Sequence, residues 1–156
     1  MLDRRFDRRG FLTRLAAFPI VTALALGRHR APRPPMTVYK SATCGCCKQW
    51  IAHVEKAGFK VTAHDVADLD ATKKDLGVPA ALASCHTAVL GPYLIEGHVP
   101  VDVIDKFLAE KPAGARGLAV PGMPQSAPGM DVPAAKDQYD VLLFTATGKT
   151  RVYAKR

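Results

Sequence analysis

The order of the expected elements predicts an α/β single domain that ends in a β-hairpin. Three observations lead to this fold class. Apolar residues alternate in short runs typical of strands, they recur at helical spacing between those runs, and glycine or proline separates most of the segments. Hydrophobic residues make up 48% of the 156-residue chain, which is enough for one packed core and excludes disorder throughout.

The first part of the domain is expected to alternate strands and helices. Trp50, Ile51 and Val54 would form the inward face of the first helix. In chain order we expect a strand over 36–41, a helix over 46–57 capped by Thr43 and stopped by Gly58, a strand in which Phe59, Val61 and Ala63 share one face, a short helix capped by Asp68 or Asp70 and ended by Gly77, hairpin strands over 87–90 and 93–96, and a helix through Val101, Ile104, Phe107 and Leu108 that stops before Pro112.

The second part of the domain is less regular. Residues 112–138 are rich in Pro, Gly and Ala with little apolar periodicity, so we expect a long, functional loop there. Residues 139–144 and 151–153, around Gly148, predict a closing hairpin. Because a cysteine cluster lies between the first strand and its helix, the whole order predicts a thioredoxin-like single domain over residues 36–156, with a long Pro/Gly/Met loop and a C-terminal β-hairpin.

Residues 1–31 are expected to be an export signal, separate from the domain. A basic start precedes an uncharged apolar run over 15–27, whose thirteen residues fall short of the roughly 20 that span a bilayer. The sequence Arg8-Arg9-Gly10-Phe11-Leu12 is typical of a twin-arginine signal. The alternative is a membrane anchor, which Pro19 within the run disfavours. We therefore expect a periplasmic protein that meets the membrane only during export.

The charge distribution argues against nucleic acid as a partner. The formal net charge is +8, but residues 1–31 hold seven arginines against two aspartates, a net charge of +5, which leaves +3 for the rest. The chain has no phosphate-binding loop, serine triad or Rossmann fingerprint. His53 and His64 are expected to be solvated or to have their hydrogen bonds satisfied, and they are given no role. The Lys73-Lys74 pair is expected on a solvated face.

Cysteine and histidine side chains are expected to converge at one edge of the sheet. The third strand runs antiparallel to the first, and the fourth reverses again, so the end of the first strand, the start of the third and the end of the fourth meet. The residues at these three places are Cys44, Cys46 and Cys47, then Cys85 and His86, then His98.

Thiolates together with imidazoles suit copper or zinc. The loop methionines, Met123 and Met130, carry neutral thioether sulfur, which suits Cu(I) better than Zn(II), so copper is expected and zinc is disfavoured. An extended chain from Pro112 to Met123 reaches roughly 35 Å, which is enough to bring the loop back to this edge. Two alternatives remain: a thiol–disulfide oxidoreductase that uses Cys44 and Cys47, and a disulfide-stapled adaptor without chemistry of its own.

Four blocks of sequence resemble the CopG-type copper-resistance family, whose members are small exported bacterial proteins. In order, the blocks are Thr43-Cys44-Gly45-Cys46-Cys47, Ser84-Cys85-His86-Thr87-Ala88-Val89, Glu96-Gly97-His98-Val99-Pro100, and Gly117-Leu118-Ala119-Val120-Pro121-Gly122-Met123-Pro124 followed by Pro128-Gly129-Met130. The resemblance implies a thioredoxin-like fold and a periplasmic site in which cysteine thiolates bind one or several copper ions.

The same resemblance implies roles for individual residues. It assigns metal ligation to Cys44, Cys46, Cys47, Cys85, His98, Met123 and Met130, with His86 as a weaker ligand candidate that would otherwise orient a neighbour. The implied function is to sequester or relay copper, with cycling between Cu(I) and Cu(II) and exchange with other periplasmic copper proteins. A copper-linked oxidoreductase activity stays open.

Overall fold

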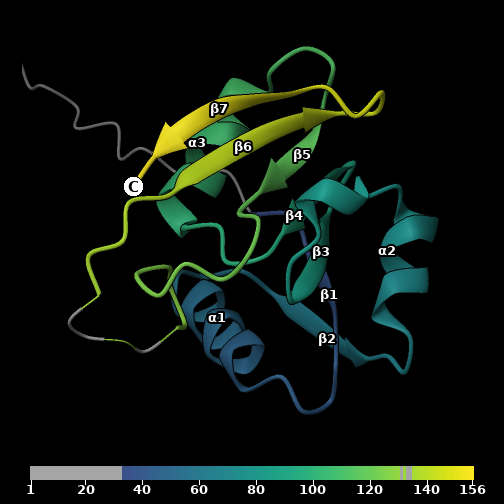
Figure 1. Ribbon diagram of the computed structural model, residues 1–156, viewed down its shortest axis with the longest axis vertical. Coiled ribbons are helices and arrows are strands. Elements are labelled where there is room, and N and C mark those ends of the chain that lie inside the picture. The colour runs from purple at the N-terminus through teal and green to yellow at the C-terminus, as the bar shows by residue number, and fades with distance from the viewer. Residues whose placement is uncertain (1–32, 131, 133–134) are drawn as a thin grey trace, which may run out of the picture. The chain divides into compact units, whose positions relative to one another are not determined.

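The computed structural model describes residues 33–130, 132 and 135–156, so the expected signal segment over 1–31 lies outside the described residues. The described chain forms one mixed sheet of seven strands in the order β2-β1-β3-β4-β5-β6-β7 (Figure 1). The strands are β1 (Met36–Lys40), β2 (Val61–Asp65), β3 (His86–Leu90), β4 (Tyr93–Glu96), β5 (Ala115–Ala119), β6 (Asp140–Thr145) and β7 (Thr150–Lys155). The expected α/β single domain is confirmed for this part of the chain.

Three helices and a short 3-10 turn accompany the sheet: α1 (Gly45–Lys56), α2 (Leu69–Leu76), α3 (Val101–Glu110) and the turn η1 (Ala80–Leu82). Strand β1 is parallel to β2 and antiparallel to β3, which pairs antiparallel with β4. Both expected hairpins, β3–β4 and β6–β7, are confirmed. Asp68 and Asp70 are the two expected caps of α2. Asp68 is the N-cap of this helix, since its side chain accepts a hydrogen bond from the amide of Ala71.

Two details expected for the first part of the domain are wrong. The N-cap of α1 is Cys44 and not Thr43, because the sulfur of Cys44 accepts a hydrogen bond from the amide of Cys47. Of the three residues expected to share one face of the second strand, only Val61 and Ala63 lie in β2, which forms the end of the sheet and pairs with β1. Phe59 is buried, but it precedes the strand.

The expected loop over 112–138 is also wrong in its first part, because that stretch contains β5. This strand pairs parallel with β4 and antiparallel with β6, so its neighbours define it more than its own sequence does. Gly117 permits the pairing: a Cβ atom there would lie 2.0 Å from the carbonyl oxygen of Leu94. The irregular segment is therefore shorter and runs from β5 to β6.

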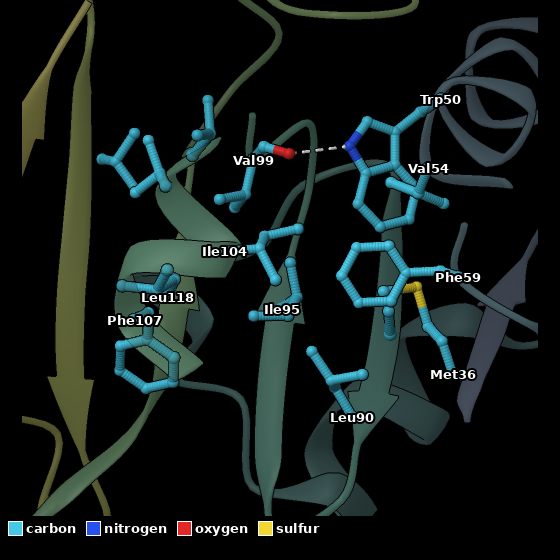
Figure 2. Close-up of a cluster of buried hydrophobic side chains, with 14 of the residues drawn as sticks. Met36, Trp50, Val54, Phe59, Leu90, Ile95, Val99, Ile104, Phe107 and Leu118 are labelled. Atoms are coloured by element: carbon cyan, nitrogen blue, oxygen red, sulfur yellow. Dashed lines mark hydrogen bonds between the residues drawn. The ribbon is translucent and has the colours of Figure 1, made fainter. Parts of the chain in front are cut away.

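The two faces of the sheet have separate apolar cores. Helices α1 and α3 pack on one face, where Trp50 and Phe107 are fully buried against inward residues such as Ile95 and Leu118 (Figure 2). On the other face, Leu76 and Leu82, from α2 and η1, pack near Leu94 and Phe144. In Figure 1, α2 lies across the β1–β3 part of the sheet from α1.

The indole of Trp50 fixes α1 to the segment that follows β4. Its Nε1–H donates a hydrogen bond of 3.0 Å to the carbonyl oxygen of Val99 (Figure 2). This bond joins the first helix to the residue next to His98, so the apolar core lies directly beside the expected metal site.

Among the described residues, no helix is long and apolar enough to cross a membrane.

Candidate metal site

The start of α1 places three sulfur atoms together. Cys44 caps the helix, with its sulfur 3.3 Å from the amide nitrogen of Cys47, and its sulfur lies 3.6 Å from that of Cys46. Cys44 and Cys47 form a disulfide across the first turn, whereas Cys46 and Cys85 are free thiols. The positive end of the helix dipole lies at this turn and favours a thiolate over a thiol.

Strand pairing brings the fourth cysteine to the same place. Lys40, the last residue of β1, pairs with His86, the first residue of β3, so Cys85 lies next to the start of α1. The sulfur of Cys47 lies 3.4 Å from the carbonyl oxygen of Cys85. The expected convergence is confirmed: the sulfur atoms of Cys44, Cys46, Cys47 and Cys85 all lie within 4.8 Å of one another.

A second donor group shares Cys85 with the first. The ligand atoms of Cys85, His86 and His98 also lie within 4.8 Å of one another. The sulfur of Cys85 is 3.0 Å from Nε2 of His98 and 3.3 Å from Nδ1 of His86. Cys85 therefore links a sulfur-only group to a group that contains two imidazoles.

The loop between β5 and β6 determines the tautomer of His98. Nδ1 of this histidine lies 2.6 Å from the carbonyl oxygen of Pro128, and only a protonated Nδ1 can donate to that oxygen. Nε2 then carries the lone pair and faces Cys85. A carbonyl that orients a histidine in this way is the usual outer partner of a metal-binding imidazole.

Both histidines are buried and neutral, whereas an ordinary loop histidine is exposed to solvent. Burial lowers the pKa of His98, although its hydrogen bond to Pro128 opposes this shift. Burial lowers the pKa of His86 well below 6.5, and the nearby His98 imidazole and the charge of Lys73 also oppose its protonation. Neutral imidazoles have a free lone pair at neutral pH, as a metal ligand needs.

Cys85 is protonated at neutral pH in the metal-free protein. Burial, and then the neighbouring Cys46, raise the pKa of the Cys85 thiol to about 12. A metal that binds Cys85 must therefore displace a proton, which a soft cation does by its own charge.

His86 is held beneath the cluster by packing. Its ring lies 4.4 Å from the ring of Trp50 and 5.1 Å from that of His98, measured between centroids. Its Nε2 is buried without a hydrogen-bond partner. The imidazole therefore has one nitrogen directed at Cys85 and another that is buried without a partner, and this burial was not predicted.

The loop between β5 and β6 returns to the site, as its length allows. The hydroxyl of Ser84 donates a hydrogen bond of 2.6 Å to the carbonyl oxygen of Gly122, directly before Met123. Met123 is 55% exposed, and Met130 is half-buried. Both methionines thus follow backbone that contacts the site, while their role as ligands stays a prediction.

Two residues near the site were missed by sequence reasoning. Lys73, expected on a solvated face, is 4% exposed and forms an ion pair with Glu96, which is fully buried. The spacing of Leu69, Lys73 and Leu76 could have revealed it, since residues at i, i+4 and i+7 share one helix face.

The fold and this donor set define a class: a single mixed α/β domain with a cluster of thiol and imidazole groups suited to a metal ion. A family model described as a protein of unknown function, DUF411, matches residues 82–130. No curated protein matches the chain.

Two solved structures, titled copper resistance protein copG Form 1 and Form 2, are similar to this chain at 44% and 45% identity, each with a TM-score of 0.74. Each alignment covers 80% of this chain, and 98% and 99% of the respective solved chain. The chain therefore belongs to the CopG copper-resistance protein family.

Proposed function

We propose that this protein binds copper at the cysteine–histidine cluster and sequesters or relays it. One observation carries the proposal: four sulfur atoms lie within 4.8 Å of one another, and one of them, in Cys85, also belongs to a group with His86 and His98. Donors this close together fit either one ion or several ions bridged by shared thiolates. The similarity to two structures titled copper resistance proteins supports copper as the cargo.

The donor set favours copper over zinc. A cluster rich in sulfur, with neutral imidazoles, matches the preference of Cu(I) for soft ligands. Structural zinc sites take four donors in a tetrahedron, whereas Cys44, Cys46, Cys47, Cys85, His86 and His98 offer six at this edge. In the proposed site the thiolates are terminal or bridging ligands and Nε2 of His98 is a nitrogen ligand.

We assign the methionines a capping role in the same site. The backbone before Met123 is tied to Ser84, and the exposure of this methionine would let it meet an arriving ion. Pro128, two residues before Met130, contacts His98. Either thioether would then bind Cu(I) from the solvent side and control its access.

The disulfide gives the site a redox function. A dithiol reductant that opens the Cys44–Cys47 disulfide becomes a disulfide itself and leaves two thiols for copper. In the reverse direction, two Cu(II) ions can take one electron each from the two thiolates, which yields two Cu(I) ions and restores the disulfide. Copper would return to Cu(II) if two Cu(I) ions each gave one electron to the Cys44–Cys47 disulfide, which would then become two thiolates.

We further propose a periplasmic location and a thioredoxin-like core. The order β1, α1, parallel β2, then the β3–β4 hairpin and α3 supports the fold assignment. The basic and apolar pattern of residues 1–31 supports export by a twin-arginine signal, which ends before the domain begins. Partners would be copper ions and other periplasmic copper proteins.

An anaerobic titration of the reduced protein with Cu(I) tests the proposal. Wild-type protein should retain copper against a competing chelator, and a Cys44→Ser/Cys85→Ser variant should lose most of it, because these substitutions remove a sulfur from both donor groups. A His53→Ala/His64→Ala variant is a matched control that should keep its copper, since both histidines are exposed and lie outside the donor groups. Equal copper retention by wild type and the double cysteine variant would end the copper hypothesis.

A second candidate is a thiol–disulfide oxidoreductase. The disulfide between Cys44 and Cys47 favours it, because the half-buried Cys44 is open to attack while Cys47 is buried. A substrate dithiol would be oxidised to a disulfide as the Cys44–Cys47 bond is reduced. Turnover of a disulfide or dithiol substrate by metal-free protein would support this candidate, and the absence of turnover would exclude it.

A further inference from the structure

A buried ion pair lies across the sheet from the imidazoles. Nζ of Lys73 is 2.6 Å from Oε1 of Glu96 and 2.9 Å from the hydroxyl oxygen of Thr87. The side chains of Lys73 and Glu96 are 5% and 0% exposed. A buried ion pair adds little net stability, because removing both charges from water costs about as much as their attraction returns. Stability alone therefore does not explain why Lys73 and Glu96 are buried here.

Glu96 holds both sides of the Cys85 segment. Its Oε1 accepts a hydrogen bond of 2.6 Å from the amide of Ser84, the residue before Cys85. Its Oε2 accepts one of 2.6 Å from the hydroxyl of Thr87, the residue after His86. Cys85 and His86 thus lie between two anchors on a single buried carboxylate.

The same anchor reaches the loop and the second histidine. Glu96 is two residues before His98, and the hydroxyl of Ser84 donates to the carbonyl oxygen of Gly122, next to Met123. Lys73 completes the arrangement, because its ammonium donates to both Glu96 and Thr87 and compensates the buried charge.

We propose that Glu96, held by Lys73, is a positioning residue of the metal site: it fixes the backbone of Ser84 and the side chain of Thr87, and so determines where Cys85 stands relative to the sulfurs of α1. The expected effect on metal affinity rests on the proposed copper function, but the anchoring of Ser84 and Thr87 by Glu96 can be measured without metal. Outer partners of ligands typically change metal affinity by about 10- to 100-fold when removed.

Two double variants separate anchoring from charge. Lys73→Met/Glu96→Gln removes both charges and keeps an amide that can accept from Ser84 and donate to Thr87. Lys73→Met/Glu96→Met removes both charges and the anchor. Neither variant leaves a buried charge unpaired, so both are expected to fold. The Met/Met variant also leaves the amide of Ser84 and the hydroxyl of Thr87 without their acceptor, so it should have the lower melting temperature.

The first readout is amide hydrogen exchange at Ser84 and Cys85 in the metal-free protein. The Met/Met variant should exchange about tenfold faster there than wild type, whereas the Met/Gln variant should stay near wild type. The second readout is Cu(I) affinity, which should fall about tenfold or more in the Met/Met variant and recover in the Met/Gln variant.

Equal exchange at Ser84 and Cys85 in both variants would overturn the proposal, as would an equal Cu(I) affinity of the two variants. If wild type itself holds no more copper than Cys44→Ser/Cys85→Ser, the proposed function fails, and the exchange rates alone decide whether Glu96 positions Cys85.

Discussion

Gly129→Ala and Gly122→Ala form a matched pair that tests how the loop holds the site. Both glycines have positive φ, +85° and +70°, so an alanine at either position costs about 1–2 kcal/mol of backbone strain. A Cβ atom at Gly122 would meet nothing within 4 Å, but at Gly129 it would lie 2.6 Å from the backbone nitrogen of Trp50 and 2.9 Å from its Cα. Only the second substitution forces the loop away from α1.

The additional cost follows from what the loop carries. Moving residue 129 pulls Pro128 from His98, whose Nδ1–H then loses its acceptor at 2.6 Å. A buried donor without a partner costs about 1–3 kcal/mol, so Gly129→Ala should be less stable than Gly122→Ala by about that amount. Without its carbonyl partner, His98 should also bind copper about tenfold more weakly.

Urea unfolding of the reduced, metal-free variants measures the first effect, and competition with a Cu(I) chelator measures the second. Equal midpoints for the two alanine variants would refute the claim that close packing on α1 holds the loop. Unchanged copper affinity in Gly129→Ala would refute the role of Pro128 in orienting His98.

Three further predictions concern buried charge and pH. Glu96→Gln alone should destabilise the protein by about 3 kcal/mol in urea unfolding, because it leaves Lys73 buried without its counter-charge, and an unchanged midpoint would contradict this. The pKa of Cys85 is raised from 9.0 to about 12, so the thiol of the unfolded chain ionises first as the pH rises, and the free energy of unfolding should fall above about pH 9. Cys85→Ser should flatten this fall, and an equal fall in the variant would contradict the role of Cys85. Burial lowers the pKa of His86 and His98, so the stability that these neutral histidines contribute is complete above about pH 6.5 and should be lost as the pH falls through their lowered pKa values. A urea midpoint that does not change below about pH 6.5 would contradict this.

The placement of the cysteines and histidines could be predicted because it depends on strand direction alone. Once β1, β3 and β4 were identified from their apolar alternation, the ends that meet at one edge followed, and with them Cys44, Cys85 and His98. Side-chain type then limited the chemistry to thiol and imidazole reactions. No knowledge of side-chain packing was needed for either step.

The features that escaped prediction depend on contacts between distant segments. Strand β5 has only one large apolar residue, Leu118, and it is recognisable only from the two strands that flank it and from the close approach at Gly117. The burial of Lys73 depends on Glu96, which is 23 residues away in the chain. The orientation of His98 depends on a backbone carbonyl, which any residue at position 128 would supply.

X-ray absorption at the copper edge, on reduced protein loaded anaerobically with Cu(I) and then desalted, tests the central claim most directly. The proposed site predicts retained copper with mainly sulfur neighbours and a contribution from histidine nitrogen, and a loss of sulfur neighbours in Cys44→Ser/Cys85→Ser. Copper surrounded only by nitrogen and oxygen, or no copper retained after desalting, would contradict it.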